Sequence, residues 1–197
     1  MNLILASSSK NRQDIFNMVG LKYKVIKSSI EEHSNATEPT QYVIDLSKDK
    51  ANSVANQINE KAIIISADTI IYMNGKIFEK PKNKDEAFNN LKAMSGNVTY
   101  AVTGITIKDL YQNKEISFAD TAEVHFKEIS DSDIKWYVDN EKRLLNQCGY
   151  TILGKAAFFI DKVVGDYNTV FGISPSRVYS KLQELGYSLS DFELQNS

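Results

Sequence analysis

The chain has 197 residues, of which 42% are hydrophobic and 24% are charged, a composition typical of globular proteins. This length suits one α/β domain or two small lobes that share a core, but not several independent domains. The formal net charge of −2 gives no basis for coating a nucleic acid polymer or an anionic membrane, so a small anionic ligand would need a local group of cations.

The cysteine content and the lengths of the apolar runs indicate the cellular compartment of the protein. The single cysteine, Cys148, excludes a disulfide within the chain and a zinc site built from cysteines. The apolar run after Met1 is too short for the core of a signal peptide, and no apolar run approaches the length that spans a membrane. We therefore expect a cytoplasmic protein with no membrane partner and no nucleic acid polymer as partner.

Apolar patterns and turn residues predict a mixed order of strands and helices. The first half predicts a strand over 2–6, a helix that ends near Gly20, a strand over 23–26, a helix that opens at Pro39, and a buried strand over 62–65 that ends in Ser66-Ala67-Asp68-Thr69 and is extended by 70–73. The second half predicts a hairpin turn at Asn74-Gly75, a helix from Asn83 to Gly96, paired strands over 98–108 and 116–127, a helix capped by Ser130, a strand over 157–164 and a helix over 175–185. This order is typical of a mixed α/β fold with an antiparallel centre.

The first candidate site is the serine loop that joins the first strand to the first helix. Backbone N–H groups, hydroxyls and the partial positive charge of a helix N-terminus favour an anion there. Lys10 and Arg12 add full charges, and a guanidinium can hold two phosphate oxygens at once. The alternative is that Ser9 merely caps the helix and that Arg12 is a solvated surface residue.

The second candidate is Asp68, in an Ala-Asp-Thr unit directly after the Ile-rich strand. A carboxylate at the end of a buried strand lies where α/β folds place working groups, because strand ends open onto the crevice. Such a residue can bind a hard cation or accept a proton from an attacking water. The alternative is an aspartate that hydrogen-bonds the backbone of a turn.

Further charged residues add to these two candidates. Lys50 falls on the apolar stripe of the long helix, so it either snorkels to the surface or reaches into a cleft to meet an anion. Glu31 and Glu32 form a loop pair that either supplies a metal ligand or is solvated. Lys80 precedes Pro81, which favours an extended backbone that can project the amine into a cleft. Acids and cations of this kind are the inventory for metal-assisted phosphoryl transfer.

Eight short motifs follow one another from Leu3 to about Leu185: Leu-Ala-Ser-Ser-Ser, Glu31-Glu32, Lys50-Ala51, Ala67-Asp68-Thr69, Lys80-Pro81, Ser95-Gly96, Val102-Thr103-Gly104 and Gly165-Asp166-Tyr167. In this order and spacing the chain resembles the Maf nucleotide pyrophosphatases. The resemblance implies a mixed α/β (α+β) fold like that of inosine triphosphatases, with an elongated mixed sheet and helices in two lobes around a central cleft. It also implies one Maf-like domain over 1–197 and, as is common in the family, a homodimer.

The resemblance assigns roles to the candidate residues. It implies cleavage of a nucleoside triphosphate between the α and β phosphates, giving the monophosphate and pyrophosphate, with a divalent metal, Mg²⁺ or Mn²⁺. Asp68 would be the catalytic acid-base residue, and Glu32 would help it to hold the metal. The triphosphate would be held by Ser7, Ser9, Arg12, Lys50 and Lys80.

Departures from the family pattern affect the choice of base. Asn11 replaces the first arginine of Ser-Pro-Arg-Arg, a position tied to substrate choice, and Leu153 replaces the base-selecting glutamine or glutamate. Thr69 keeps the pattern of the dTTP/UTP branch, so we expect dTTP, UTP or a modified nucleotide as substrate. A site that loses a polar contact to the base loses discrimination. The alternative function is a catalytically silent nucleotide-binding regulator that acts through a partner, for example in cell division.

Overall fold

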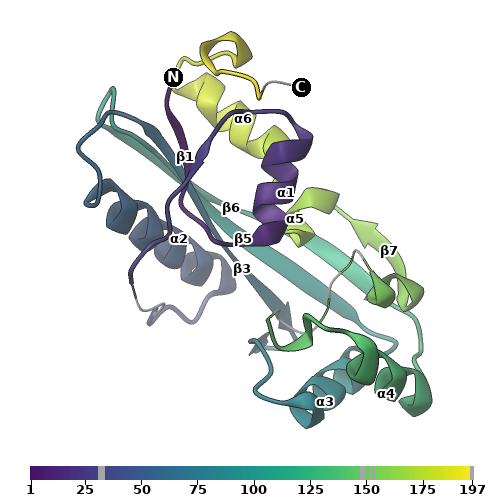
Figure 1. The fold of residues 1–197 in the computed structure, drawn as a ribbon. Coiled ribbons are helices and arrows are strands. Elements are labelled where there is room, and N and C mark those ends of the chain that lie inside the picture. The colour runs from purple at the N-terminus through teal and green to yellow at the C-terminus, as the bar shows by residue number, and fades with distance from the viewer. Residues whose placement is uncertain (31–33, 147–149, 151, 153, 196–197) are drawn as a thin grey trace. The chain divides into compact units, whose positions relative to one another are not determined.

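The protein has a mixed α/β fold, as predicted. The computed structural model describes residues 1–30, 34–146, 150, 152 and 154–195 (Figure 1). The strands are β1 (Leu3–Leu5), β2 (Lys24–Val25), β3 (Ile63–Met73), β4 (Lys76–Phe78), β5 (Val98–Asp109), β6 (Lys114–Phe126) and β7 (Ile160–Val164). The helices are α1 (Lys10–Met18), α2 (Pro39–Ala55), α3 (Lys84–Met94), α4 (Asp131–Asn140), α5 (Tyr167–Val170) and α6 (Pro175–Glu184). Over these described ranges, none of the helices has the length and apolar character needed to cross a membrane.

Local sequence signals account for several of these elements. Asn74 and Gly75 have φ values of 51° and 80°, which the turn between β3 and β4 requires. The side chain of Asn83 accepts a 2.8 Å hydrogen bond from the backbone N–H of Glu86 and so caps α3. The predicted strand over 157–164 begins only at Ile160, because residues Lys155–Phe158 form a 3-10 helix.

The chain divides into two compact units, and each is described by itself. Unit 1 comprises Met1–Thr69, Thr103–Asp120 and Phe171–Ser197. Its strand order is β2-β1-β3-β5-β6, with β1 parallel to both β2 and β3. In this unit α2 covers one face of β3, and α1 and α6 lie on the other face (Figure 1). The face under α2 includes an apolar cluster of Ile4, Ala6, Ala51, Val54, Ala62 and Ile64.

Unit 2 comprises Ile70–Val102 and Thr121–Val170, so β3, β5 and β6 contribute residues to both units. Its strands include β4, antiparallel to β3, and β7, antiparallel to β6. Helices α3 and α4 pack on an almost wholly apolar core, which includes Leu91, Met94, Ile134, Tyr137 and Phe159. Burial of these large side chains is the main source of stability in this unit.

Candidate active site

Asp68 lies inside β3, which runs without a break from Ile63 to Met73. The prediction that the strand ends in Ser66-Ala67-Asp68-Thr69 is therefore wrong, whereas its extension through 70–73 is confirmed. Apolar residues on both sides of the Ala-Asp-Thr unit keep the strand extended. It is the neighbouring strand that stops: β1 pairs with β3 through Leu3 to Leu5, opposite Ile63 to Ile65, and Ala6 N–H then donates to Ile65 O at 2.8 Å. Asp68 therefore lies on a stretch of β3 beyond the end of β1, and a strand end is where α/β folds open.

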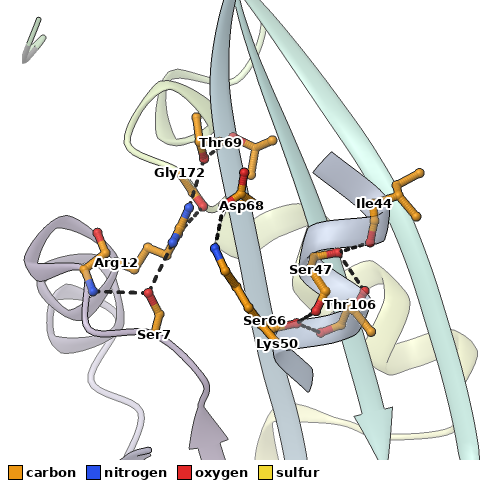
Figure 2. Close-up of polar contacts among 12 residues, drawn as sticks. Ser7, Arg12, Ile44, Ser47, Lys50, Ser66, Asp68, Thr69, Thr106 and Gly172 are labelled. Atoms are coloured by element: carbon orange, nitrogen blue, oxygen red, sulfur yellow. Dashed lines mark hydrogen bonds and ion pairs between the residues drawn. The ribbon is translucent and has the colours of Figure 1, made fainter. Parts of the chain in front are cut away.

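The first cluster at this position is the ion pair of Lys50 and Asp68, which we call the carboxylate pair. Lys50 Nζ donates to Asp68 Oδ1 at 2.5 Å (Figure 2). The two side chains are only 8% and 11% exposed. A buried cation needs an anionic partner, which explains why the apolar stripe of α2 tolerates a lysine. Lys50 thus reaches inward instead of snorkelling to the surface.

The second cluster surrounds the guanidinium of Arg12, and we call it the arginine cluster; its members are Ser7, Arg12, Thr69, Thr103 and Gly172. Arg12 donates from Nε to Gly172 O at 2.8 Å, from Nη1 to Ser7 Oγ at 3.1 Å and from Nη2 to Thr69 Oγ1 at 3.1 Å. The Thr69 hydroxyl also shares a 2.8 Å hydrogen bond with that of Thr103. Arg12 is therefore a buried, fixed side chain, and the alternative of a solvated surface arginine is wrong.

Gly172 is a site residue that the sequence patterns missed. Its φ of 99° lies in the region that favours glycine. A Cβ atom there would lie 3.0 Å from Thr69 Oγ1 and 3.1 Å from Arg12 Nε, too close for both to stay in place. Arg12 and Gly172 are 160 residues apart in the chain, and no local pattern connects them.

The two clusters meet at consecutive residues of β3. Side chains alternate along a strand, so Asp68 and Thr69 point to opposite faces. Asp68 meets Lys50 of α2 on one face, and Thr69 meets Arg12 of α1 on the other (Figure 2). Because β1 stops short of this stretch, a ligand at the edge of β3 can reach both faces. The arrangement offers an anion two cations and offers a water molecule one carboxylate.

Other members of the serine loop have weaker roles in the geometry. Ser9 occupies the N-cap position of α1 but makes no capping bond with its side chain; its N–H donates to Ser7 Oγ at 3.1 Å. Lys10 pairs with Asp14 at 2.6 Å on the exposed side of α1. Asn11 is half-buried on the same helix. Ser7, rather than Ser9, is thus the hydroxyl that connects the loop to Arg12.

Comparison with known proteins settles the family. Residues 2–185 match the sequence model of the Maf family, described as Maf-like protein. The chain belongs to the Maf family. The resemblance predicted from the motifs is therefore confirmed.

Two relatives of this Maf protein carry the name dTTP/UTP pyrophosphatase. The one from Thermoanaerobacter sp. (strain X514) is 38% identical over 183 residues, which cover 93% of this chain and 96% of that protein. The one from Thermosipho melanesiensis is 41% identical over 182 residues, which cover 92% and 97%. A solved structure of a HAM1 protein from Coxiella burnetii aligns with a TM-score of 0.48 and 15% identity, covering 93% of this chain and 99% of that one.

Lys80, Glu32 and Leu153 are the remaining predicted site residues of this Maf protein. Lys80 belongs to unit 2, where it is exposed just after β4. Glu32 and Leu153 lie outside the described residues. Within the described part of the chain, no group of three or more histidine, cysteine or acidic side chains is arranged to hold a metal. Asp68 is the predicted metal ligand whose surroundings can be described.

Proposed function

We propose that this Maf protein hydrolyses a pyrimidine nucleoside triphosphate, dTTP or UTP, to the nucleoside monophosphate and pyrophosphate. The observation that carries the proposal is the carboxylate pair, a buried lysine and aspartate at hydrogen-bond distance beside the arginine cluster. Family membership and the dTTP/UTP pyrophosphatase names of the relatives support this class of reaction and this class of substrate.

Asp68 acts as the general base in the proposed reaction. It accepts a proton from a water molecule whose oxygen forms a bond to the α-phosphorus. The bond from that phosphorus to the bridging oxygen breaks, and pyrophosphate leaves with the electron pair. Lys50 keeps the carboxylate in place and adds a positive charge beside it. Fixed cations of this kind stabilise the charge that builds on the phosphates.

Ser7 and Arg12 form the proposed phosphate side of the site. The N-terminus of α1 and the serine loop favour an anion. Arg12 donates to Ser7, Thr69 and Gly172. It therefore fixes the loop to β3 and to Gly172 while it presents its charge to the substrate. Ser9 and Lys80 remain proposed contacts to the triphosphate.

A divalent cation, Mg²⁺ or Mn²⁺, fits the donors at this site. Asp68 keeps Oδ2 outside its bond to Lys50, and Mg²⁺ is usually held by one or two carboxylates together with substrate phosphates. Asp68 and Glu32 would hold the ion. When bound, it would offset the charge of the phosphates.

Thr69, Asn11 and Leu153 are the proposed specificity residues. The hydroxyl of Thr69 is engaged by Arg12 and by Thr103, so Thr69 connects the choice of substrate to the position of the guanidinium. A larger residue at this position would displace Arg12 from the loop. Selectivity and phosphate binding are therefore expected to change together in variants of Thr69.

A screen of pyrophosphate release tests the proposal. Common and modified nucleoside triphosphates would be incubated with the protein in Mg²⁺ or Mn²⁺, and the products would be separated. We expect dTTP or UTP to give the monophosphate and pyrophosphate in equal amounts, and a chelator to stop the reaction. Release of orthophosphate with a diphosphate would contradict the proposed bond cleavage. Tight nucleotide binding with no product would favour the silent regulator.

A further inference from the structure

We propose that a row of hydroxyl groups, three of them fully buried and one half-buried, positions Lys50 against Asp68, with Thr106 as its central positioning residue. The row, which we call the hydroxyl seam, consists of Ser47, Ser66, Thr106 and Ser117. It joins α2 to β3, β5 and β6 within unit 1. The inference rests on the proposed catalytic role of the carboxylate pair, to which it adds residues that act through Lys50 and Asp68.

Short hydrogen bonds connect the seam across the elements. The hydroxyls of Ser47 and Thr106 lie 2.8 Å apart, and Ser66 Oγ donates to the backbone carbonyl of Ser47 at 2.6 Å (Figure 2). On the far side, the hydroxyls of Thr106 and Ser117 are 2.9 Å apart. Thr106 therefore connects the helix above the sheet to the neighbouring strand within it.

The seam lies one step away from each member of the carboxylate pair. Ser47 is three residues before Lys50 on α2, so the two side chains lie on the same face of the helix, one turn apart. Ser66 is two residues before Asp68 on β3, so the two side chains point to the same face of the strand. A bond from Ser66 to the carbonyl of Ser47 consequently fixes the helix on the strand next to the ion pair.

Gly104 provides independent evidence that α2 lies at a fixed height above β5. A Cβ atom at Gly104 would collide with the carbonyl group of Val43 and would lie 2.7 Å from Ile44 N. These are backbone atoms of α2, so they cannot move without the helix. Gly104 and Thr106 are two residues apart on β5 and face α2 together. The close approach at Gly104 and the hydrogen bond at Thr106 thus both fix the distance between α2 and β5.

Directional bonds explain why this face carries hydroxyls. Ser47, Ser66 and Thr106 have no exposed surface, and apolar residues would bury more favourably at such positions. Apolar packing alone is non-directional, whereas a hydrogen bond weakens steeply when its distance or angle changes. The pair at 2.5 Å depends on such a fixed helix, because a misplacement of about 1 Å at a catalytic group costs about a hundredfold in rate.

Thr106→Val tests the seam, because it keeps the branched shape and removes the hydroxyl. We expect kcat to fall about tenfold with KM within about twofold, since the change displaces a reacting group without removing a substrate contact. Thr106→Ser, which keeps the hydroxyl, should restore most of the activity. Ser66→Ala removes a hydrogen-bond donor without adding volume and should also lower kcat. It provides a second test of the seam if Thr106→Val folds poorly.

Thr99→Val is the matched control. Thr99 lies seven residues earlier on β5, is also fully buried, and shares a 3.1 Å hydrogen bond with the hydroxyl of Tyr150 in unit 2. Loss of this hydrogen bond in Thr99→Val should lower the melting temperature as Thr106→Val does, but should leave kcat within about twofold of the parent. If Thr99→Val lowered kcat as much as Thr106→Val does, the proposed role of the seam would be wrong, since both losses of activity would then reflect general destabilisation.

A double-mutant comparison separates the seam from the proposed function. In a Lys50→Met background, Thr106→Val should cause no further fall in kcat, because its effect passes through Lys50. If Thr106→Val lowered kcat about tenfold in both backgrounds, the proposed role of the seam would be wrong. It would also be wrong if Thr106→Val kept the parent kcat while Lys50→Met was inactive, and in both cases the proposed function would stand. Parent activity in Lys50→Met itself would overturn the role of the carboxylate pair and the seam with it.

Discussion

The interiors of both units contain apolar clusters, but unit 1 also buries an ion pair beside its apolar cluster. In unit 2, α3 and α4 bury large apolar residues such as Leu91, Met94 and Tyr137. In unit 1, the face under α2 buries Lys50 and Asp68 together with the hydroxyls of Ser47, Ser66 and Thr106. The same strand, β5, contributes to both interiors, and both have well-formed elements.

This contrast separates residues that we expect to serve stability from residues that we propose to serve chemistry. A buried ion pair contributes little to stability compared with well-packed apolar residues of similar volume, because desolvation of two charges offsets their attraction. The apolar core of unit 2 has no such cost. The ion pair of unit 1 is therefore best explained by a reaction that needs a carboxylate and an amine held in contact.

The largest effect is expected when the carboxylate pair is neutralised. The double variant Lys50→Met with Asp68→Asn should lower kcat for dTTP or UTP by at least about a thousandfold, since it removes the base and a fixed cation. Its melting temperature should equal or exceed that of the parent, because no unpaired buried charge remains. Pyrophosphate release and thermal unfolding measure the two quantities. A marked drop in melting temperature would show that the pair mainly serves stability.

A core truncation in unit 2 should have the opposite result. Leu91 is fully buried on α3, so Leu91→Ala should lower the free energy of unfolding by about 2–5 kcal/mol. Well below the melting temperature, kcat should stay within about twofold of the parent. Denaturant unfolding and initial rates at a low temperature test this. A large loss of kcat in the fully folded variant would contradict the division of roles.

Asp109 is a buried acid of unit 1 that we expect to serve stability and not the proposed active site. Asp109 is fully buried, but its Oδ1 accepts the N–H of Tyr111 at 2.8 Å, and its Oδ2 accepts the hydroxyl of Tyr187 at 2.8 Å. Burial, together with the bond to Asp109, raises the pKa of Tyr187. Because the folded pKa lies above the unfolded one, this contribution to stability is complete below about pH 10 and is lost as pH rises through the folded pKa.

Tyr187→Phe should therefore flatten the alkaline loss of stability and leave catalysis unchanged. Melting temperatures of the parent and the variant, measured between pH 8 and pH 11 (on the order of the tyrosine range), should converge at the alkaline end. The kcat of the variant near neutral pH should equal that of the parent. A loss of activity would instead place Asp109 and Tyr187 in the functional machinery.

Sequence patterns predicted the parts of this molecule that depend on neighbours in the chain. Asn74-Gly75 specified a turn, Asn83 specified a helix start, and the phase of Lys50 placed it on the apolar stripe of its helix. The role of Asp68 came from the resemblance to the Maf family, because a carboxylate in an Ala-Asp-Thr unit has several uses. The course of β3 through Asp68 was predicted only in part. The strand was expected to end in the polar Ser-Ala-Asp-Thr stretch, which is typical of a strand end, and to be extended by 70–73.

Contacts between distant parts of the chain could not be predicted from these patterns. Gly172 supports Arg12 across 160 residues, and Thr106 meets Ser47 across 59. Serine and threonine are residue types usually found in loops and on surfaces, so the sequence does not show which of them are buried. Their hydrogen-bond partners become known only when the strand order is known. Long-range pairing therefore supplied Gly172 and the proposed positioning residue Thr106, whereas local patterns supplied the charged candidates.

The most direct test of the proposed role of Asp68 is the rate of pyrophosphate release by Asp68→Asn compared with the parent protein, with dTTP and UTP as substrates. The substitution keeps the size of the side chain and removes the basic oxygen that would accept the proton. We expect kcat to fall by at least about a thousandfold at temperatures where the variant is folded, with the nucleotide-binding affinity close to that of the parent. The melting temperature should fall, because Lys50 loses its buried anionic partner. Hydrolysis by Asp68→Asn at the parent rate would contradict a general base at this position.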